Sequence, residues 1–291
     1  MVFDFCTINK IINIVVASAK IQELKLPHIS IRPQIHCIIT GAIGSTKSSL
    51  LNDVCKELKL TPLTNVKPSH LSGTVDKTTG NPIVPITWDN RNTVLPIDEL
   101  HTSKTSSNRE AIRDLLMMLE FPKFQKRVGY RCNSTKLQDK DLFCRIQDGQ
   151  ILIKTRFVFL ATTMMPLHKH QQMIELQALK TRCLILPYYP SLKELKLKLS
   201  GQEMFKFKKY RPPKKIKISK KDYEIIKETV FNKNLGLTYI MRSVGDLCRI
   251  FAVIGKHDFG LYDLILSSRV GTSRVKKKDL IDYGVTEESV F

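Results

Sequence analysis

The residues best suited to chemistry form a glycine-containing turn, Gly41-Ala42-Ile43-Gly44-Ser45-Thr46-Lys47-Ser48-Ser49, which follows the apolar run 35–40. A strand, such a turn and a helix in succession are the layout of a phosphate-binding loop, although Thr46 replaces the last glycine of the strict pattern. Backbone N–H groups of the turn and the positive end of the helix bind phosphates, Lys47 reaches them, and Ser48 offers its hydroxyl to Mg²⁺. The residues predicted to bind nucleotide are Gly41, Gly44, Ser45, Thr46, Lys47, Ser48 and Ser49.

Two acidic residues, Asp98 and Glu99, end the later apolar run 93–97. An aspartate at such a strand end holds Mg²⁺ directly or through water, and a following glutamate can polarise the water that attacks the γ-phosphate. We therefore expect Ser48 and Asp98 to share the metal ion and Glu99 to act on the water.

Three further positions complete the candidate catalytic set. The apolar run 151–161 ends in Ala161-Thr162-Thr163, where a hydroxyl can orient the attacking water, and we assign this role to Thr163. Arg182 precedes the apolar run 184–186, and an arginine there can enter a neighbouring subunit's nucleotide site. Arg242 opens a helical segment and can reach nucleotide from a second domain, with Arg249 on roughly the same face. Polar strand ends and surface arginines are the ordinary alternatives for all three.

The elements that must position these residues alternate between strands and helices. Apolar runs predict strands at 35–40, 93–97, 151–161 and 184–186, and helical spacing predicts helices at 48–58 and 108–120. A further helix is expected within 4–24, a hairpin or loop insertion at 61–87, and a hairpin turn at Asp148-Gly149. This alternation indicates an α/β fold, a three-layer domain with a largely parallel sheet.

A change of composition near residue 205 predicts two segments. Residues 206–221 are strongly basic and contain Pro212-Pro213, so they suit an interdomain linker, a DNA contact or a nuclear-targeting patch. Apolar segments compatible with helices follow at 222–232, 238–256, 261–270 and 278–283. We expect an ATPase core over 1–205, and a basic linker with a small helical domain over 206–291.

The charge of the chain favours a polyanionic partner. Its formal net charge is +20 and its pI is near 9.7, which suits nucleic acid, with a solvated basic surface as the alternative. The seven cysteines show no C-x-x-C pair and are expected to be reduced core residues, without disulfides or zinc. No apolar run reaches membrane-spanning length, so we expect an intracellular protein, cytoplasmic or in the nucleoid or nucleus.

The order of these motifs resembles the AAA+ ATPases, and within them the motor domain of the MCM replicative helicases. Ile31-Arg32-Pro33-Gln34-Ile35 is similar to the family's R-G-D-I-N stretch. Gly41–Leu51 is similar to its phosphate loop, G-D-P-G-T-A-K-S-Q-L-L, in which a residue other than glycine also precedes the lysine. In this chain Ala42-Ile43 replaces the acidic-proline pair of that loop.

The later motifs continue the resemblance. They are Ser72–Gly80 at the family's hairpin insertion, Pro96–Leu100 at its Walker B motif, Ala161–Thr163 at its sensor 1, Thr181–Cys183 at its S-R-F arginine finger, and Arg242–Val244 at its sensor 2 helix. Thr162-Thr163 stands where the family has an Asn-Pro ending, so the sensor 1 assignment to Thr163 stays open by one position. The likeness covers roughly residues 1–270, and no counterpart of the family's N-terminal DNA-binding, zinc-bearing domain is recognised.

The resemblance implies a P-loop AAA+ core with β-hairpin insertions and a small helical lid that carries sensor 2. It implies ATP and Mg²⁺, nucleotide held between subunits of a homo-oligomeric ring, with a hexamer favoured, and single-stranded or forked DNA in a basic channel. Hairpins at about 74–87 and 126–150 would carry the DNA contacts, for which solvated loop charge is the alternative. The candidates are Lys77, Lys123, Lys126, Arg127 and Arg131.

Two other functions remain open at this point. The chain can be a remodelling or loading ATPase that acts on a protein partner, or works with a separate DNA-binding or loading protein, without helicase activity. It can also be a degenerate AAA+ fold that binds nucleotide or DNA structurally, although retention of Lys47, Ser48, Asp98, Glu99 and Arg182 argues against this. A short motor of this type favours a viral or plasmid origin.

Overall fold

The computed structural model describes residues 3–42, 44–64, 66–75, 78–79, 82–83, 86–89, 93–100, 106–121, 123–127, 144–147, 150–154, 156–164, 178–179, 181–201, 206–208, 210–233, 235 and 237–270. The predicted helix at 278–283 lies outside these residues, as does the predicted turn at Asp148-Gly149 itself.

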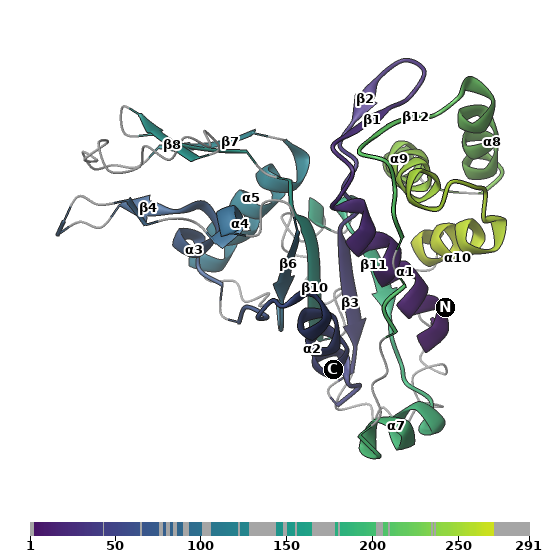
Figure 1. The fold of residues 1–291 in the computed structure, drawn as a ribbon, viewed down its shortest axis with the longest axis horizontal. Coiled ribbons are helices and arrows are strands. Elements are labelled where there is room, and N and C mark those ends of the chain that lie inside the picture. The colour runs from purple at the N-terminus through teal and green to yellow at the C-terminus, as the bar shows by residue number, and fades with distance from the viewer. Residues whose placement is uncertain are drawn as a thin grey trace.

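A four-stranded parallel sheet forms the centre of the fold, and its strands stand in the order β11-β3-β10-β6 (Figure 1). The strands are β3 (Cys37–Gly41), β6 (Val94–Ile97), β10 (Val158–Met164) and β11 (Leu184–Pro187). In the register, Met164 lies beside Gly41 and Ala161 lies beside Ile97. The strand that enters the glycine-containing turn and the strand that leads to the acidic pair therefore both border β10.

Helices cover both faces of this sheet. Alternate residues of its strands point to opposite sides, and the apolar side chains on each side are buried against helices. Cys37 and Ile39 join one hydrophobic core with α1 (Phe5–Ser18) and α2 (Lys47–Leu58). Ile38 joins a second core with α5 (Ser106–Glu120) and, through Leu71, with α3 (Pro68–Ser72). The predicted three-layer α/β arrangement is thus confirmed for the described part of the chain.

The helices α8 (Lys220–Phe231), α9 (Leu237–Ile254) and α10 (Phe259–Val270) gather beyond α1 (Figure 1). They match three of the predicted helical segments. Ile226 of α8, Leu247 of α9 and Tyr262 of α10 belong to the same hydrophobic core as Ile11 of α1. A continuous core therefore crosses the predicted boundary near residue 205.

The basic segment 206–221 contains a strand that was not predicted from its composition. β12 (Lys215–Lys217) pairs in parallel with β1 (Glu23–Lys25), and β1 pairs with β2 (Ser30–Ile31). Lys215 and Lys217 are exposed, whereas Ile216 is half-buried and Ile218 is buried. This alternation is the signature of a strand with one covered face, so this part of the segment is not an unstructured linker.

The expected strand at 151–161 divides into two strands of different sheets. β9 (Gln150–Lys154) pairs with β7 (Lys123–Arg127) and with β8 (Cys144–Gln147), whereas β10 belongs to the central sheet. The run is broken around Arg156, which is exposed, so one continuous strand was a wrong interpretation. Gln147 of β8 pairs with Gln150 of β9, and the predicted turn at Asp148-Gly149 falls between these two described residues.

Smaller elements complete the chain. The predicted insertion at 61–87 contains α3, a hairpin of β4 (Thr74–Val75) and β5 (Pro82–Ile83), and the start of α4 (Ile86–Asp89). β4 and the sheet of β7 and β8 extend away from the central sheet on the side opposite α8 (Figure 1). The unpredicted α7 (Leu192–Leu199) begins at a capping box of Ser191 and Glu194. Among the helices of the described residues, none is long and apolar enough to cross a bilayer.

Candidate functional site

The turn after β3 adopts a conformation that explains its glycines. Gly44 has φ +77°, in the left-handed region that glycine adopts without steric cost. A Cβ on Gly41 would collide with the carbonyl oxygen of Tyr188 and would press on the Ser45 hydroxyl. Thr46 also lies in the left-handed region, at φ 60° and ψ 17°, where a threonine is strained. Such strain is typical of binding and catalytic turns.

The amino terminus of α2 points into this turn. Thr46 is the N-cap residue of α2, and its side chain makes no capping hydrogen bond. The first N–H groups of a helix have no acceptor within the helix, so those of Lys47, Ser48 and Ser49 are available at the turn. Together with the positive end of the helix dipole they suit an anion such as phosphate.

Lys47 places its ammonium group inside the turn. Its Nζ atom donates to the carbonyl oxygens of Gly41 at 2.9 Å and Ala42 at 2.7 Å, and to Ser45 Oγ at 3.0 Å. The residue is only 8% exposed. Burial lowers the pKa of Lys47, and the nearby charges of Asp98 and Glu99, which raise it, offset this only in part.

Ser48 and Asp98 meet across the carboxyl edge of the sheet. Ser48 Oγ donates to Asp98 Oδ1 at 2.9 Å, and Thr162 Oγ1 donates to the same oxygen at 2.6 Å. Neighbouring oxygens of an octahedral Mg²⁺ shell, at metal–oxygen distances of about 2.0 to 2.1 Å, are about 2.8 to 3.0 Å apart. The separation of Ser48 Oγ and Asp98 Oδ1 therefore fits two adjacent ligands of one magnesium ion.

The backbone around the acidic pair is held from both sides. The Asp98 N–H donates to the Leu63 carbonyl at 2.8 Å, and the Leu100 N–H donates to the Thr162 carbonyl at 2.8 Å. Between them, Glu99 has φ 55°, and its N–H donates to Thr162 Oγ1 at 3.0 Å. Glu99 is exposed. These contacts fix Asp98 toward Ser48 while they turn Glu99 outward, where its carboxylate can meet a solvent water.

Thr162, and not the predicted Thr163, contacts the acidic pair. Successive residues of a strand point to opposite faces, so only one of the two hydroxyls can lie beside Asp98. Thr163 is buried and donates to the Leu100 carbonyl at 3.3 Å. The predicted strand end does lie beside the acidic pair, and the hydroxyl that contacts Asp98 belongs to Thr162 rather than to Thr163.

Arg182 and Arg242 lie near the amino ends of the parallel strands, opposite the carboxyl edge that carries the turn. Leu184, two residues after Arg182, pairs with Cys37, the first residue of β3, whereas the turn follows Gly41 at the other end. Four residue steps along a strand span about 13 Å. Arg182 Nε donates to Glu120 Oε2 at 2.6 Å, and an Arg242 Nη donates to both Glu120 oxygens at 2.9 Å. Within one chain these two arginines contact Glu120 rather than the turn.

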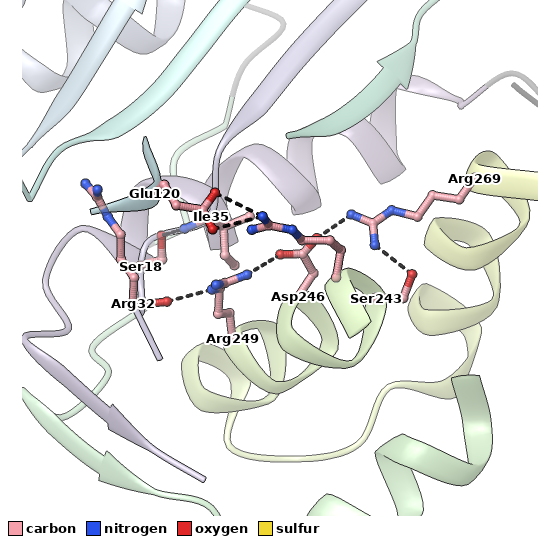
Figure 2. Close-up of polar contacts among 9 residues, drawn as sticks. Ser18, Arg32, Ile35, Glu120, Ser243, Asp246, Arg249 and Arg269 are labelled. Atoms are coloured by element: carbon pink, nitrogen blue, oxygen red, sulfur yellow. Dashed lines mark hydrogen bonds and ion pairs between the residues drawn. The ribbon is translucent and has the colours of Figure 1, made fainter. Parts of the chain in front are cut away.

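A buried ionic network continues from this point into α9 and α10, as Figure 2 shows. Asp246 accepts from Arg249 at 2.5 Å and also from Arg269, and Arg269 donates to Ser243 Oγ at 2.6 Å. Arg249 Nε donates to the Arg32 carbonyl at 2.7 Å, so Arg249 connects α9 to the segment that precedes β3. The i, i+3 spacing of Asp246 and Arg249 was a sequence signal for part of this network.

The predicted DNA contacts fall largely outside the described structure. Lys77 and Arg131 are not among the described residues. Lys123, Lys126 and Arg127 lie on β7, whose backbone pairs with β9, but their side chains are outside the described part. Among the residues that the structure describes, no group of three or more His, Cys, Asp or Glu side chains could hold a metal ion.

No protein-family model matches the chain, and no curated protein matches it either. The geometry of the site and the charge of the chain are therefore the grounds on which a function can be proposed.

Proposed function

We propose that the chain hydrolyses ATP and is an MCM-like AAA+ motor that acts on DNA. The observation that carries the proposal is the convergence of Lys47, Ser48, Asp98 and Thr162 at one edge of the sheet. These residues come from α2 and from the ends of β6 and β10. A buried lysine, a hydroxyl and a carboxylate, arranged beside a helix amino terminus, are the groups that a nucleoside triphosphate with its magnesium ion requires.

Each residue has a defined role in this proposal. Lys47 and the N–H groups at the start of α2 bind the β- and γ-phosphates. Ser48 and Asp98 hold Mg²⁺, which when bound neutralises charge on the phosphate oxygens. Thr162 fixes the Asp98 carboxylate through its 2.6 Å hydrogen bond. Glu99, exposed beside this pair, polarises the attacking water.

Two observations support DNA as the substrate on which the motor acts, and a third supports a ring. The net charge of +20 favours a polyanion. The β4–β5 hairpin and the sheet of β7, β8 and β9 extend from the core as the hairpins of such a motor would (Figure 1). Arg182 and Arg242 lie too far from their own turn to act there, which suits a ring in which they face the nucleotide of a neighbouring copy.

The test is steady-state ATP hydrolysis with and without single-stranded DNA. We expect hydrolysis that DNA stimulates, and a loss of about 100-fold or more in Lys47→Ala because the phosphate charge is no longer balanced. Lys20→Ala removes the same charge from an exposed turn and should leave the rate unchanged. No hydrolysis by the wild type, with or without DNA, would contradict the proposal.

Two comparisons separate the motor from the alternatives. Hydrolysis that is indifferent to DNA would favour a remodelling or loading ATPase with a protein partner. Displacement of a strand from a forked duplex would favour the helicase. DNA binding that does not weaken from low to high salt would contradict phosphate contacts in a basic channel.

A further inference from the structure

Glu120 is the single carboxylate on which Arg182 and Arg242 converge in the described structure. Glu120 is the last residue of α5, Arg182 lies two residues before β11, and Arg242 lies in the first turns of α9. Arg182 Nε and an Arg242 Nη make three hydrogen bonds of 2.6 to 2.9 Å with the two oxygens of Glu120. Two arginines from distant parts of the chain thus form one anion site, and the Glu120 carboxylate of the same chain occupies it.

This site carries an excess of positive charge. Among the described residues, the contacts of the network that Figure 2 shows in part join five arginines with two carboxylates. The arginines are Arg32, Arg182, Arg242, Arg249 and Arg269, and the carboxylates are Glu120 and Asp246. Because Asp246 is engaged with Arg249 and Arg269, removal of the Glu120 charge would leave Arg182 and Arg242 without a carboxylate partner in the described contacts.

The contact is open to exchange with a soluble anion. The side chains of Arg182, Arg242 and Glu120 are 23%, 35% and 28% exposed. Solvent reaches these partly exposed side chains, and two guanidinium groups can bind phosphate oxygens through several charge-assisted hydrogen bonds. A phosphate group therefore has both the access and the chemistry to replace the carboxylate.

Three exposed apolar side chains lie close in sequence to Glu120 and Arg242. Phe121 follows Glu120 directly, Met241 precedes Arg242, and Met117 lies one helical turn before Glu120. They are 48%, 75% and 50% exposed. Large apolar side chains beside a charged pair are typical of a surface that another protein covers. The anion that reaches this site is thus expected to arrive with a second protein surface.

We propose that Glu120 is an internal ligand of a phosphate-binding arginine pair, Arg182 and Arg242, and that a phosphate of nucleotide bound to a neighbouring copy of the chain displaces it. The neighbouring-copy part rests on the proposed function, whereas the competition between Glu120 and phosphate does not. Glu120 then keeps both arginines engaged in the free chain and gives them up on assembly.

The first experiment measures binding of inorganic pyrophosphate by calorimetry in a Lys47→Ala background, which disables the turn after β3. Adding Glu120→Gln keeps the shape of the side chain but removes the competing charge, so pyrophosphate should bind at least tenfold more tightly. Adding Arg242→Ala to that variant should abolish the gain. Glu228→Gln, a loss of the same charge at an exposed position of α8, is the matched control and should give no gain.

The second experiment identifies the source of the phosphate. Sedimentation velocity with Lys47 intact and a slowly hydrolysed ATP analogue should show self-association at a tenfold lower protein concentration for Glu120→Gln than for the wild type. If Glu120→Gln does not fold, Glu120→Asp, whose shorter side chain cannot keep all three hydrogen bonds, should shift both measurements in the same direction by a smaller factor.

The outcomes are distinct. Unchanged pyrophosphate affinity in Glu120→Gln would overturn the proposal. Tighter pyrophosphate binding with unchanged or weakened assembly would overturn the neighbouring copy as the source. If the wild type shows no Lys47-dependent ATP hydrolysis, the proposed function alone is refuted. The pyrophosphate comparison still stands in that case, because it is made in the Lys47→Ala background.

Discussion

Replacement of the two adjacent threonines of β10 by valine, one at a time, is the sharpest test of the candidate site. Thr162→Val and Thr163→Val each exchange a hydroxyl for a methyl group at a position less than 6% exposed, with little change of volume. The two variants therefore differ mainly in the hydrogen bonds that they lose. This makes each the control for the other.

The hydrogen bonds at stake differ in strength. Thr162 Oγ1 donates to the Asp98 carboxylate at 2.6 Å and accepts from the Glu99 N–H at 3.0 Å. A bond to a charged group contributes about 1.5–3 kcal/mol, so we expect Thr162→Val to lower the free energy of unfolding by about 2 kcal/mol. Thr163 makes a neutral bond of 3.3 Å to the Leu100 carbonyl, which we expect to contribute roughly 0.5 kcal/mol.

Urea unfolding and ATP hydrolysis measure the two consequences. The hydrogen bonds lost in the two variants differ by about 1.5 kcal/mol. If this whole difference raises the activation free energy, it corresponds to roughly a tenfold ratio of the two hydrolysis rates. We expect Thr162→Val to hydrolyse ATP about tenfold more slowly than Thr163→Val, which should stay near the wild type. Equal losses, or a larger loss for Thr163→Val, would show that Asp98 is not positioned as described.

Two further predictions concern the turn and the buried histidine. Gly41→Ala forces a Cβ against the Tyr188 carbonyl, so it should destabilise the fold by about 2 kcal/mol and weaken nucleotide binding, as thermal unfolding and nucleotide titration would measure. Gly245→Ala is the control, because its Cβ would make only ordinary contacts on α9 and should raise the melting temperature slightly. Equal melting temperatures for the two variants would contradict the close packing at Gly41. Burial, with the charges of Arg32 and Arg249, holds the pKa of His36 well below its usual value, although a hydrogen bond with the Leu119 backbone raises it. As the pH falls below about 6.5, only the unfolded chain therefore binds a proton at this histidine. The free energy of unfolding should then fall by up to about 1.4 kcal/mol per pH unit until the lowered pKa of the folded state is reached. His36→Gln, which retains an acceptor for the Phe159 N–H, should reduce this slope, and an unchanged slope would assign the effect to other groups.

The features that sequence predicted well are those whose signals are local. The conformation of the turn from Gly41 to Ser49 is set locally, by its glycines and by the start of α2. Asp98-Glu99 directly follows a short apolar strand. Parallel strands bring their carboxyl ends to one edge, so the meeting of Ser48 with Asp98 followed from the fold class. The predicted helices at 48–58 and 108–120 also agree closely with α2 and α5.

The features that sequence missed depend on contacts between distant segments. Whether Thr162 or Thr163 faces Asp98 depends on the side to which each residue of β10 points, and two identical side chains in succession give no local clue. The role of Glu120 depends on arginines 62 and 122 residues away, so no local pattern could indicate it. In β12 the lysines suggested a linker, although Ile216 and Ile218 alternated with them and pointed to a strand.

The packing of α1 against α9 has a consequence for the synthesis of the chain. α1 is apolar on nearly all sides, with buried residues throughout its second half, and part of its cover is α9. Leu237 leaves the ribosome roughly 220 residues after Ser18, a delay on the order of 10 to 45 s at ordinary translation rates. During that interval the side chains of α1 that α9 covers in the folded protein stay exposed, so this part of the core can form only after α9 has been synthesised.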